Sequence, residues 1–102
     1  MTTIAEQRWM DAITDLGCIV CAREGRGYVP ACVHHLLRGG RRIGHLHTIP
    51  LCPAHHSGGV CNDEYVSRHP FKREFERRYG TEEQLLEDTR RRVNSLATRK
   101  VA

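Results

Sequence analysis

Two short motifs with the same spacing constrain this chain more than any other feature of its sequence. The first is C-x-x-C at Cys18 and Cys21, and the second is C-x-x-H at Cys52 and His55. Each motif places two metal ligands on one short segment, and structural zinc sites take four such ligands in a tetrahedron. Together the motifs predict a structural zinc held by three thiolates and one imidazole.

The length of the chain makes such a metal important for stability. Its 102 residues, 1–102, are expected to form one small domain with a thin apolar core. A structural zinc contributes folding free energy on the order of 10 kcal/mol. Cys61 is an alternative ligand for this zinc, whereas Cys32 is expected to be a core residue on a strand.

The five cysteines also indicate a compartment. An odd number cannot pair completely in disulfides, and the residues after Met1 lack the apolar stretch of a signal peptide. No apolar run approaches the roughly 20 residues that a membrane span needs, so no membrane association is expected. Clustered cysteines in a cytoplasmic protein indicate a metal site, and a reducing cytoplasm is the expected location.

The hydrophobic pattern predicts an α+β fold. Residues 29–37 and 43–51 are expected to be strands, joined by a tight turn. Pro53 suits the first turn of a short helix after the second strand. Amphipathic helices are expected over residues 3–16, after Pro70 and after Thr81, whereas residues 18–28 and 60–69 are expected to be irregular. Two strands and a short helix therefore surround the predicted metal, and amphipathic helices flank them.

Histidines beside the zinc motifs predict a second site. His34 and His35 end the first predicted strand, and His56 directly follows His55. Neighbours on a helix point about 100° apart, so His55 can face the zinc while His56 faces a second metal. Successive strand residues point to opposite faces, so His34 and His35 serve one site only if the strand breaks there.

These motifs resemble those of HNH endonucleases, which have the ββα-metal fold. The matching stretch is H-T-I-P-L-C-P-A-H-H, from His47 to His56, where the family has N-x-x-x-x-C-x-x-C-H. The resemblance implies that His34 and His56 bind a catalytic metal and that His35 is the general base. His47 stands where the family usually has Asn, and His45 is a second candidate for that orienting role.

A narrower resemblance is to phage Ref-type RecA-dependent nucleases. It rests on H-H-L, G-G-R-R-I-G-H, T-I-P-L-C-P-A-H-H and F-E-R-R-Y-G-T, which together span roughly residues 16–90. It implies an α+β fold with a small zinc-containing ββα-metal core, and a metal-dependent endonuclease that hydrolyses DNA phosphodiester bonds in phage recombination. The implied catalytic metal is magnesium, manganese, nickel or zinc, and the implied partners are DNA and a RecA-type recombinase filament in the bacterial host cytoplasm.

Basic residues are consistent with a polyanionic partner. Lys and Arg number 16 against 12 acidic residues, which gives a net charge of +4. Arg38, Arg41 and Arg42 lie in the predicted turn beside the histidines, where they either hold DNA phosphates or form a solvated turn. The consecutive arginines at 90–92 are expected to be solvated, and His69 is a candidate for a further ligand or a substrate contact.

The sequence is also consistent with a second function. A zinc-stabilised nucleic-acid-binding module without catalysis needs only the four zinc ligands and a basic face. Such a module has no use for His34, His35 and His56 in one place, so the surplus of histidines favours the nuclease.

Overall fold

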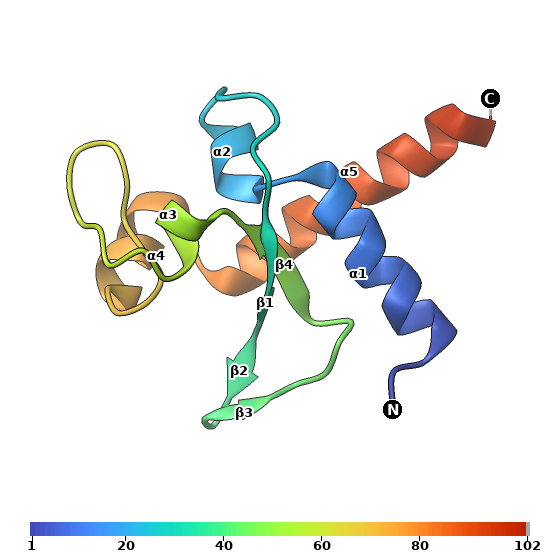
Figure 1. The fold of residues 1–102 in the computed structure, drawn as a ribbon, viewed down its shortest axis with the longest axis horizontal. Coiled ribbons are helices and arrows are strands. Elements are labelled where there is room, and N and C mark those ends of the chain that lie inside the picture. Colours follow the sequence, from blue (N-terminus) through green and yellow to red (C-terminus); the bar gives the residue numbers. More distant parts are fainter. Residues whose placement is uncertain (102) are drawn as a thin grey trace.

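Two short antiparallel strands lie at the centre of the molecule, and helices are arranged around them (Figure 1). The computed structural model describes residues 1–101, with side chains up to Leu96. Strands β1 (Cys32–His35) and β4 (Thr48–Leu51) pair so that His34 lies opposite Ile49 and His35 opposite Thr48. Helix α3 (Pro53–His56) follows β4 after a single residue. The described part of the chain is a small α+β structure.

Helix α1 (Ile4–Leu16) forms where the sequence predicts it. The Thr3 side chain accepts a hydrogen bond from the backbone of Glu6, and the Glu6 carboxylate accepts one from the backbone of Thr3. This reciprocal cap satisfies two donors at the start of the helix. Gly17, with φ of 85°, ends it, and a Cβ there would lie 2.9 Å from Val29 O, so only glycine fits.

The prediction that residues 18–28 are irregular is wrong in part. Residues predicted as a loop contain helix α2 (Ile19–Arg23), whose first residues are buried. The Cys18 sulfur accepts from the backbone N–H of Cys21 at 3.5 Å and so caps this helix. A thiol is not among the usual capping residues, which is why the sequence pattern does not reveal the helix.

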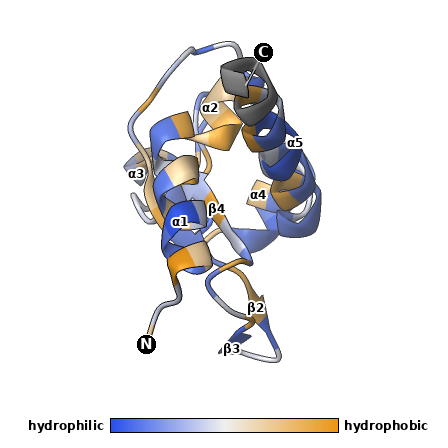
Figure 2. Ribbon diagram, turned by 90° about the vertical axis from the view of Figure 1, so that its right-hand side faces the viewer, coloured by the Kyte–Doolittle hydropathy of each residue, from blue (hydrophilic) through white to orange (hydrophobic). Residues whose placement is uncertain are grey.

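Two further helices follow at the C-terminal end, α4 (Lys72–Tyr79) and α5 (Glu82–Val101). Gly80 ends α4, and Thr81 and Gln84 exchange hydrogen bonds of 2.8 and 3.1 Å at the start of α5, as predicted. Figure 2 shows that much of the outer face of α5 is hydrophilic. None of the helices in residues 1–101 combines the length and apolar character that crossing a bilayer requires.

The core lies between the strands and the helices α2, α4 and α5. It is built from buried aliphatic and aromatic side chains together with the cysteines of the first motif and Cys52. Its members include Ile19, Val20, Leu36, Ile49, Leu51, Val66, Phe75, Leu85 and Leu86.

The predicted strand pair is interrupted near its turn. β2 (Leu37–Arg38) and β3 (Arg41–Arg42) form a separate two-stranded hairpin, whose glycine turn has φ of 60° and 79°. Only Leu36 separates β1 from β2, whereas residues 43–47 separate β3 from β4. The extra residues leave the ladder as a loop, and the hairpin projects from the body of the molecule (Figure 1).

Candidate metal centre and active site

The first cluster brings together the four predicted zinc ligands. Cys18 and Cys21 come from the capped start of α2, while Cys52 and His55 come from the start of α3. All four are buried, and their ligand atoms lie within 4.8 Å of one another. The buried Cys₃His cluster can hold a metal such as zinc.

Distances within this cluster fit a tetrahedral ion. With zinc–sulfur bonds of about 2.3 Å and zinc–nitrogen bonds of about 2.0–2.1 Å, a tetrahedron has edges of about 3.8 and 3.6 Å. The Cys21 and Cys52 sulfurs are 3.8 Å apart. The His55 Nδ1 atom lies 3.5 Å from the Cys18 sulfur, 3.5 Å from the Cys21 sulfur and 3.2 Å from the Cys52 sulfur.

The electrostatics of the cluster also fit a cation. Burial raises the pKa of the Cys18 and Cys21 thiols, and for Cys21 the neighbouring sulfurs raise it further. A bound dication reverses this balance, because coordinating thiols are deprotonated outright. Burial lowers the pKa of His55, so this imidazole is held in the neutral form that a metal requires.

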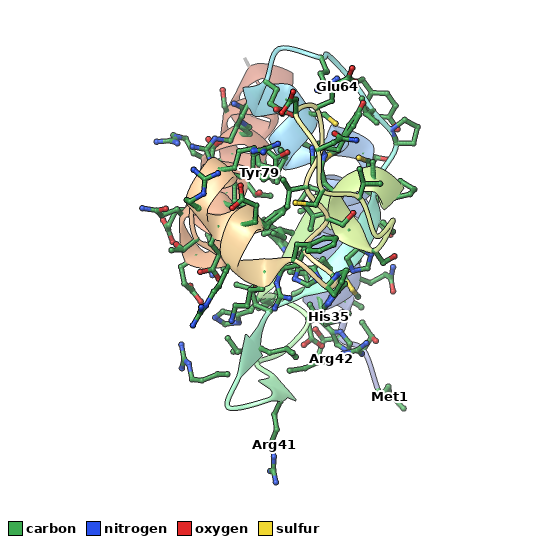
Figure 3. All side chains as sticks on the ribbon, turned by 90° about the vertical axis from the view of Figure 1, so that its left-hand side faces the viewer. Met1, His35, Arg41, Arg42, Glu64 and Tyr79 are labelled. Carbon is green, nitrogen blue, oxygen red and sulfur yellow. The ribbon has the colours of Figure 1, made fainter. Side chains whose placement is uncertain are left out.

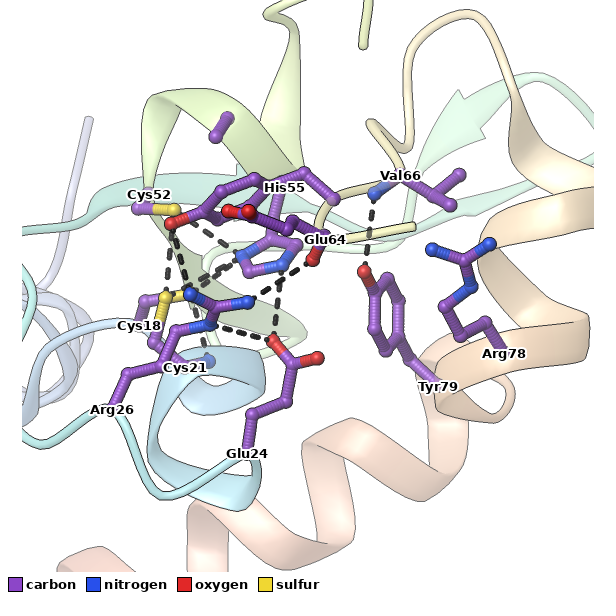
Figure 4. A network of polar contacts seen from close by, with 12 residues as sticks. Cys18, Cys21, Glu24, Arg26, Cys52, His55, Glu64, Val66, Arg78 and Tyr79 are labelled. Carbon is purple, nitrogen blue, oxygen red and sulfur yellow. Dashed lines mark hydrogen bonds and ion pairs between the residues drawn. The ribbon is translucent and has the colours of Figure 1, made fainter. Parts of the chain in front are cut away.

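A network of polar contacts surrounds the His55 ring on the side away from the sulfurs (Figure 4). The Glu24 carboxylate lies 3.5 Å from His55 Nε2 and accepts a hydrogen bond of 3.2 Å from Arg26. Arg26 in turn lies over the Tyr65 ring at 4.5 Å and donates to the Glu64 carbonyl. Outer contacts of this kind orient a metal-binding histidine and fix which nitrogen faces the metal.

The second cluster consists of three histidines, His34, His56 and His69. The first two are the predicted ligands of the catalytic metal. The ring centroids of His34 and His56 are 5.0 Å apart, and the His69 ring lies 5.4 Å from His34 and 5.3 Å from His56. One nitrogen from each ring lies within 4.8 Å of the others. His34 is buried, His56 is half-buried and His69 is exposed, so this cluster is open on one side.

Backbone pairing places His69 in the second cluster. The backbone N–H groups of Arg68 and His69 donate to the carbonyls of His55 and His56, each at 2.8 Å. The segment before α4 is thereby held against α3. The sequence marks His69 only as a candidate, because nothing in its local pattern reveals this contact.

The buried side of His34 faces an ion pair. Its Nε2 atom has no hydrogen-bond partner among the described residues and lies 3.5 Å from the Glu82 carboxylate, which pairs with Arg68. Burial of Glu82 would raise its pKa, but the contacts with His34 and Arg68 outweigh burial and lower it to about 2. Glu82 is therefore ionised beside His34.

His35 does not join the three histidines. Strand β1 stays regular through His35, so its ring points to the opposite face from His34. There His35 Nε2 lies 3.0 Å from Nδ1 of His45, in the loop of residues 43–47. Burial lowers the pKa of His35, and the nearby Arg42 guanidinium and His45 lower it further. His35 is thus neutral near pH 7.

The remaining predicted residues have different positions. The His47 side chain is in neither cluster, although its backbone carbonyl accepts from Leu36 N–H at 2.9 Å. Cys61 is exposed and outside the Cys₃His cluster. The prediction that Cys32 is a core residue is wrong: it is exposed on β1, with its sulfur 3.5 Å from His56 Nδ1.

The hairpin arginines extend into solvent. Figure 3 shows Arg41 pointing away from the hairpin, with Arg42 near His35. Arg38, Arg41 and Arg42 are exposed, and none forms an ion pair with the carboxylates that the structure describes. Arg38 lies directly opposite Arg41 in the ladder, and like charges in such a pair repel. An anion between them would relieve that repulsion.

The fold and the two clusters define a small α+β protein with a candidate Cys/His metal centre. The family model for "Recombination enhancement, RecA-dependent nuclease" matches residues 2–94, and the chain belongs to this family. This confirms the Ref-type resemblance and indicates a nuclease role in recombination. No curated protein matches the chain significantly.

Proposed function

We propose that the chain is a metal-dependent DNA endonuclease of the HNH type, formed by a single nuclease domain over residues 1–102. The observation that carries this proposal is the convergence of His34, His56 and His69 beside β1, β4 and α3. Three imidazoles open to solvent on one side suit a catalytic metal, which needs a free position for substrate. Membership of the RecA-dependent nuclease family supports the same activity.

In this proposal the three histidines hold a divalent cation at the substrate. When bound, such an ion stabilises negative charge on the phosphate and on the leaving oxygen. Imidazole ligands are softer than carboxylates, so manganese, nickel or zinc fits this site as well as magnesium does. Burial lowers the pKa of His56 and of His69, and neutral rings are the forms that bind metal.

His35 is the proposed general base. Its lowered pKa keeps it unprotonated near neutral pH, so it can accept a proton from the attacking water. Arg38, Arg41 and Arg42 hold the phosphates that flank the cut bond, because they are exposed cations that form no ion pair with the carboxylates that the structure describes, and Arg42 lies near His35. Zinc at the Cys₃His cluster stabilises the fold, and the DNA partner is presented by a RecA-type filament.

The test compares the parent protein with His35→Ala in a plasmid-nicking assay. Supercoiled plasmid is incubated with added manganese, with and without a recombinase filament. We expect the parent to nick DNA, and His35→Ala to keep its fold, its metals and DNA binding while losing cleavage by about 100-fold or more.

Two outcomes would contradict the proposal. Cleavage by His35→Ala at the parental rate would mean that His35 is not the base. DNA binding without cleavage by the parent, across all metals and with the filament present, would favour the non-catalytic zinc-stabilised module instead.

A further inference from the structure

The β2–β3 hairpin carries positive charge on both of its faces. Arg38 lies directly opposite Arg41 in the ladder, and residues opposite each other share a face. Successive residues of a strand point to opposite faces, so Arg42 shares the other face with its ladder partner Leu37. Figure 3 shows Arg41 and Arg42 pointing in different directions, with Arg42 near His35. A partner that contacts all three exposed arginines must therefore present negative charge on two sides.

The tip of this hairpin is bare backbone. Gly39 and Gly40 form the turn with φ of 60° and 79°, and a Cβ added to either glycine would meet no atom within 4 Å. Glycine at such a position allows another molecule to approach the backbone closely. Residues 37–42 are all exposed, and the hairpin projects from the body of the molecule (Figure 1). The hairpin can therefore enter a recess in its partner.

The hairpin lacks the side chains that hold single-stranded DNA. Proteins bind single strands by stacking the bases on aromatic rings along a basic groove. Residues 36–47, which comprise the hairpin and its flanks, contain no Phe, Tyr or Trp. Tyr28 is exposed, but its segment precedes β1 whereas the hairpin follows β1, so the two lie at opposite ends of that strand (Figure 1). Cations without stacking rings beside them fit the phosphates of a duplex better than unpaired bases.

We propose that the hairpin enters the major groove of duplex DNA and contacts the phosphates of both strands, an inference that rests on the proposed function. In B-DNA the major groove is about 12 Å wide and admits a two-stranded ribbon, whereas the minor groove is about 6 Å wide. A ribbon whose strands are about 4.8 Å apart, with arginines on both faces, needs the wider groove. The substrate class is therefore paired DNA.

The two faces of the hairpin then contact different strands. Arg42, beside His35, holds the phosphates of the strand that is cut. Arg38 and Arg41 hold the phosphates of the complementary strand across the groove, and these anions relieve the repulsion between the two guanidinium groups. On a single strand held by Arg42, the face with Arg38 and Arg41 would have no phosphate to contact. Only one of the three arginines then lies on the cut strand, which narrows their role in the proposed function.

The first experiment compares the affinity for a duplex with the affinity for each of its separated strands. Fluorescence anisotropy measures both with the zinc-loaded protein at one salt concentration. We expect the parent to bind the duplex about tenfold tighter or more, since only the duplex engages both faces. Arg38→Ala combined with Arg41→Ala should weaken duplex binding by about tenfold and change single-strand binding by less than about twofold. Equal affinities of the parent for duplex and single strands would overturn the proposal.

Arg90→Ala combined with Arg91→Ala is the matched control. It removes the same charge from α5, where both arginines pair with carboxylates at 2.8 Å. This variant should bind both forms of DNA within about twofold of the parent. Thermal stability and zinc content establish that both double variants are folded. An equal loss of duplex affinity in the two double variants would attribute binding to net charge and overturn the proposal.

The second experiment determines whether the hairpin contacts one strand or two. In a hybrid duplex, one whole strand carries neutral methylphosphonate linkages and the other keeps its charged phosphates. Neutralising one strand should weaken binding by the parent about tenfold more than binding by the variant that lacks Arg38 and Arg41, because that variant has already lost one of the two contacts. Equal losses in both proteins would mean that Arg38 and Arg41 do not contact a second strand, which would overturn the proposal.

Two blocked duplexes test which groove the hairpin enters. Glucosylated 5-hydroxymethylcytosine fills the major groove with sugars, whereas netropsin occupies the minor groove of A·T tracts. We expect glucosylation to weaken binding by about tenfold or more and netropsin to change it by less than about twofold. The opposite order of effects would place the hairpin in the minor groove and overturn the proposal.

Measuring binding and cleavage separately distinguishes this inference from the proposed function. A parent protein that gives the expected binding pattern but nicks no plasmid would contradict the proposed nuclease, while the hairpin would keep its place on the duplex. A parent protein that nicks plasmid but binds single strands as tightly as the duplex would support the nuclease and overturn the place of the hairpin in the groove.

Discussion

The two Cys/His clusters lie on either side of α3, yet they differ in closure. His55 points into a buried group of three sulfurs, whereas its neighbour His56 points to two imidazoles, one of which is exposed. Structural metal sites are closed by four protein ligands, and catalytic sites keep a position open. In the proposed function one turn of helix serves both purposes, because adjacent residues diverge by about 100°.

The surroundings of the clusters differ in the same way. Glu24, Arg26 and Tyr65 enclose the outer side of His55 and tie α2 to the loop before α4. The second cluster is supported on its buried side, where Glu82 and Arg68 lie against His34. A site held on one side and open on the other can admit a substrate. Variants that affect fold and activity differently can test this division.

The largest expected effect concerns the closed cluster, which is the buried Cys₃His group. Cys52→Ala should unfold or aggregate the protein, because losing a ligand forfeits much of the roughly 10 kcal/mol that a structural zinc contributes. Thermal unfolding and zinc content measure this, with Cys61→Ala as the matched control, since Cys61 is exposed and outside the cluster. A soluble, cooperatively folded Cys52→Ala protein without zinc would contradict the structural role.

The next effect concerns the open cluster, which consists of His34, His56 and His69. His56→Ala should keep the fold and the structural zinc, because His55 remains, but lose the second metal and about 100-fold or more of the cleavage rate. Metal content and plasmid nicking are measured on the same sample. Excess manganese should restore part of the rate through His34 and His69. Loss of the fold in His56→Ala would show that the two clusters do not have separate roles.

A smaller effect is expected from the outer contacts of the closed cluster. Glu24→Gln should weaken zinc binding by about 10-fold to 100-fold while leaving the zinc-loaded fold intact, because the carboxylate supports the His55 ring. Zinc competition with a chelator measures the affinity. Glu83→Gln, which removes the same charge from an exposed position on α5, should bind zinc like the parent. Equal zinc affinities in the parent and both variants would show that Glu24 does not support zinc binding by His55.

Local signals make several elements of the fold predictable. The capping residues Thr3 and Thr81 and the terminators Gly17 and Gly80 act within one helical turn, so the sequence locates these helix ends correctly. Helix α2 cannot be predicted in this way, because it depends on a thiol cap and on burial of its first turn. The thiol cap and this burial result from the metal-ligand cluster rather than from the helix propensity of the residues.

Long-range contacts account for what the sequence could not predict at the site. The interrupted strand pair depends on the chain of hydrogen bonds from Trp9 through Thr48 to His45, which no local pattern reveals. His69 reaches the cluster through backbone bonds across the loop after α3. The prediction that Cys32 is a core residue fails because apolar and polar residues do not alternate clearly in V-P-A-C-V-H-H-L-L. The sequence therefore does not show which face of β1 carries Cys32.

The smallest effect tests the hairpin arginines against those of α5, which differ in their partners. Arg90 and Arg91 pair with Glu87 and Asp88 at 2.8 Å, whereas Arg41 and Arg42 form no ion pair with the carboxylates that the structure describes. A cation without a carboxylate partner is free to replace counterions on DNA.

Replacing Arg41 and Arg42 together by Ala should therefore weaken binding to all sequences and lower the salt slope by roughly 0.9 for each duplex phosphate that is no longer neutralised. The measurement is the dependence of duplex DNA affinity on salt concentration. Arg90→Ala with Arg91→Ala changes the net charge equally and should leave the slope near its parental value. Equal reductions in the two double variants would attribute binding to net charge, and the projecting hairpin would then have no particular role in holding DNA.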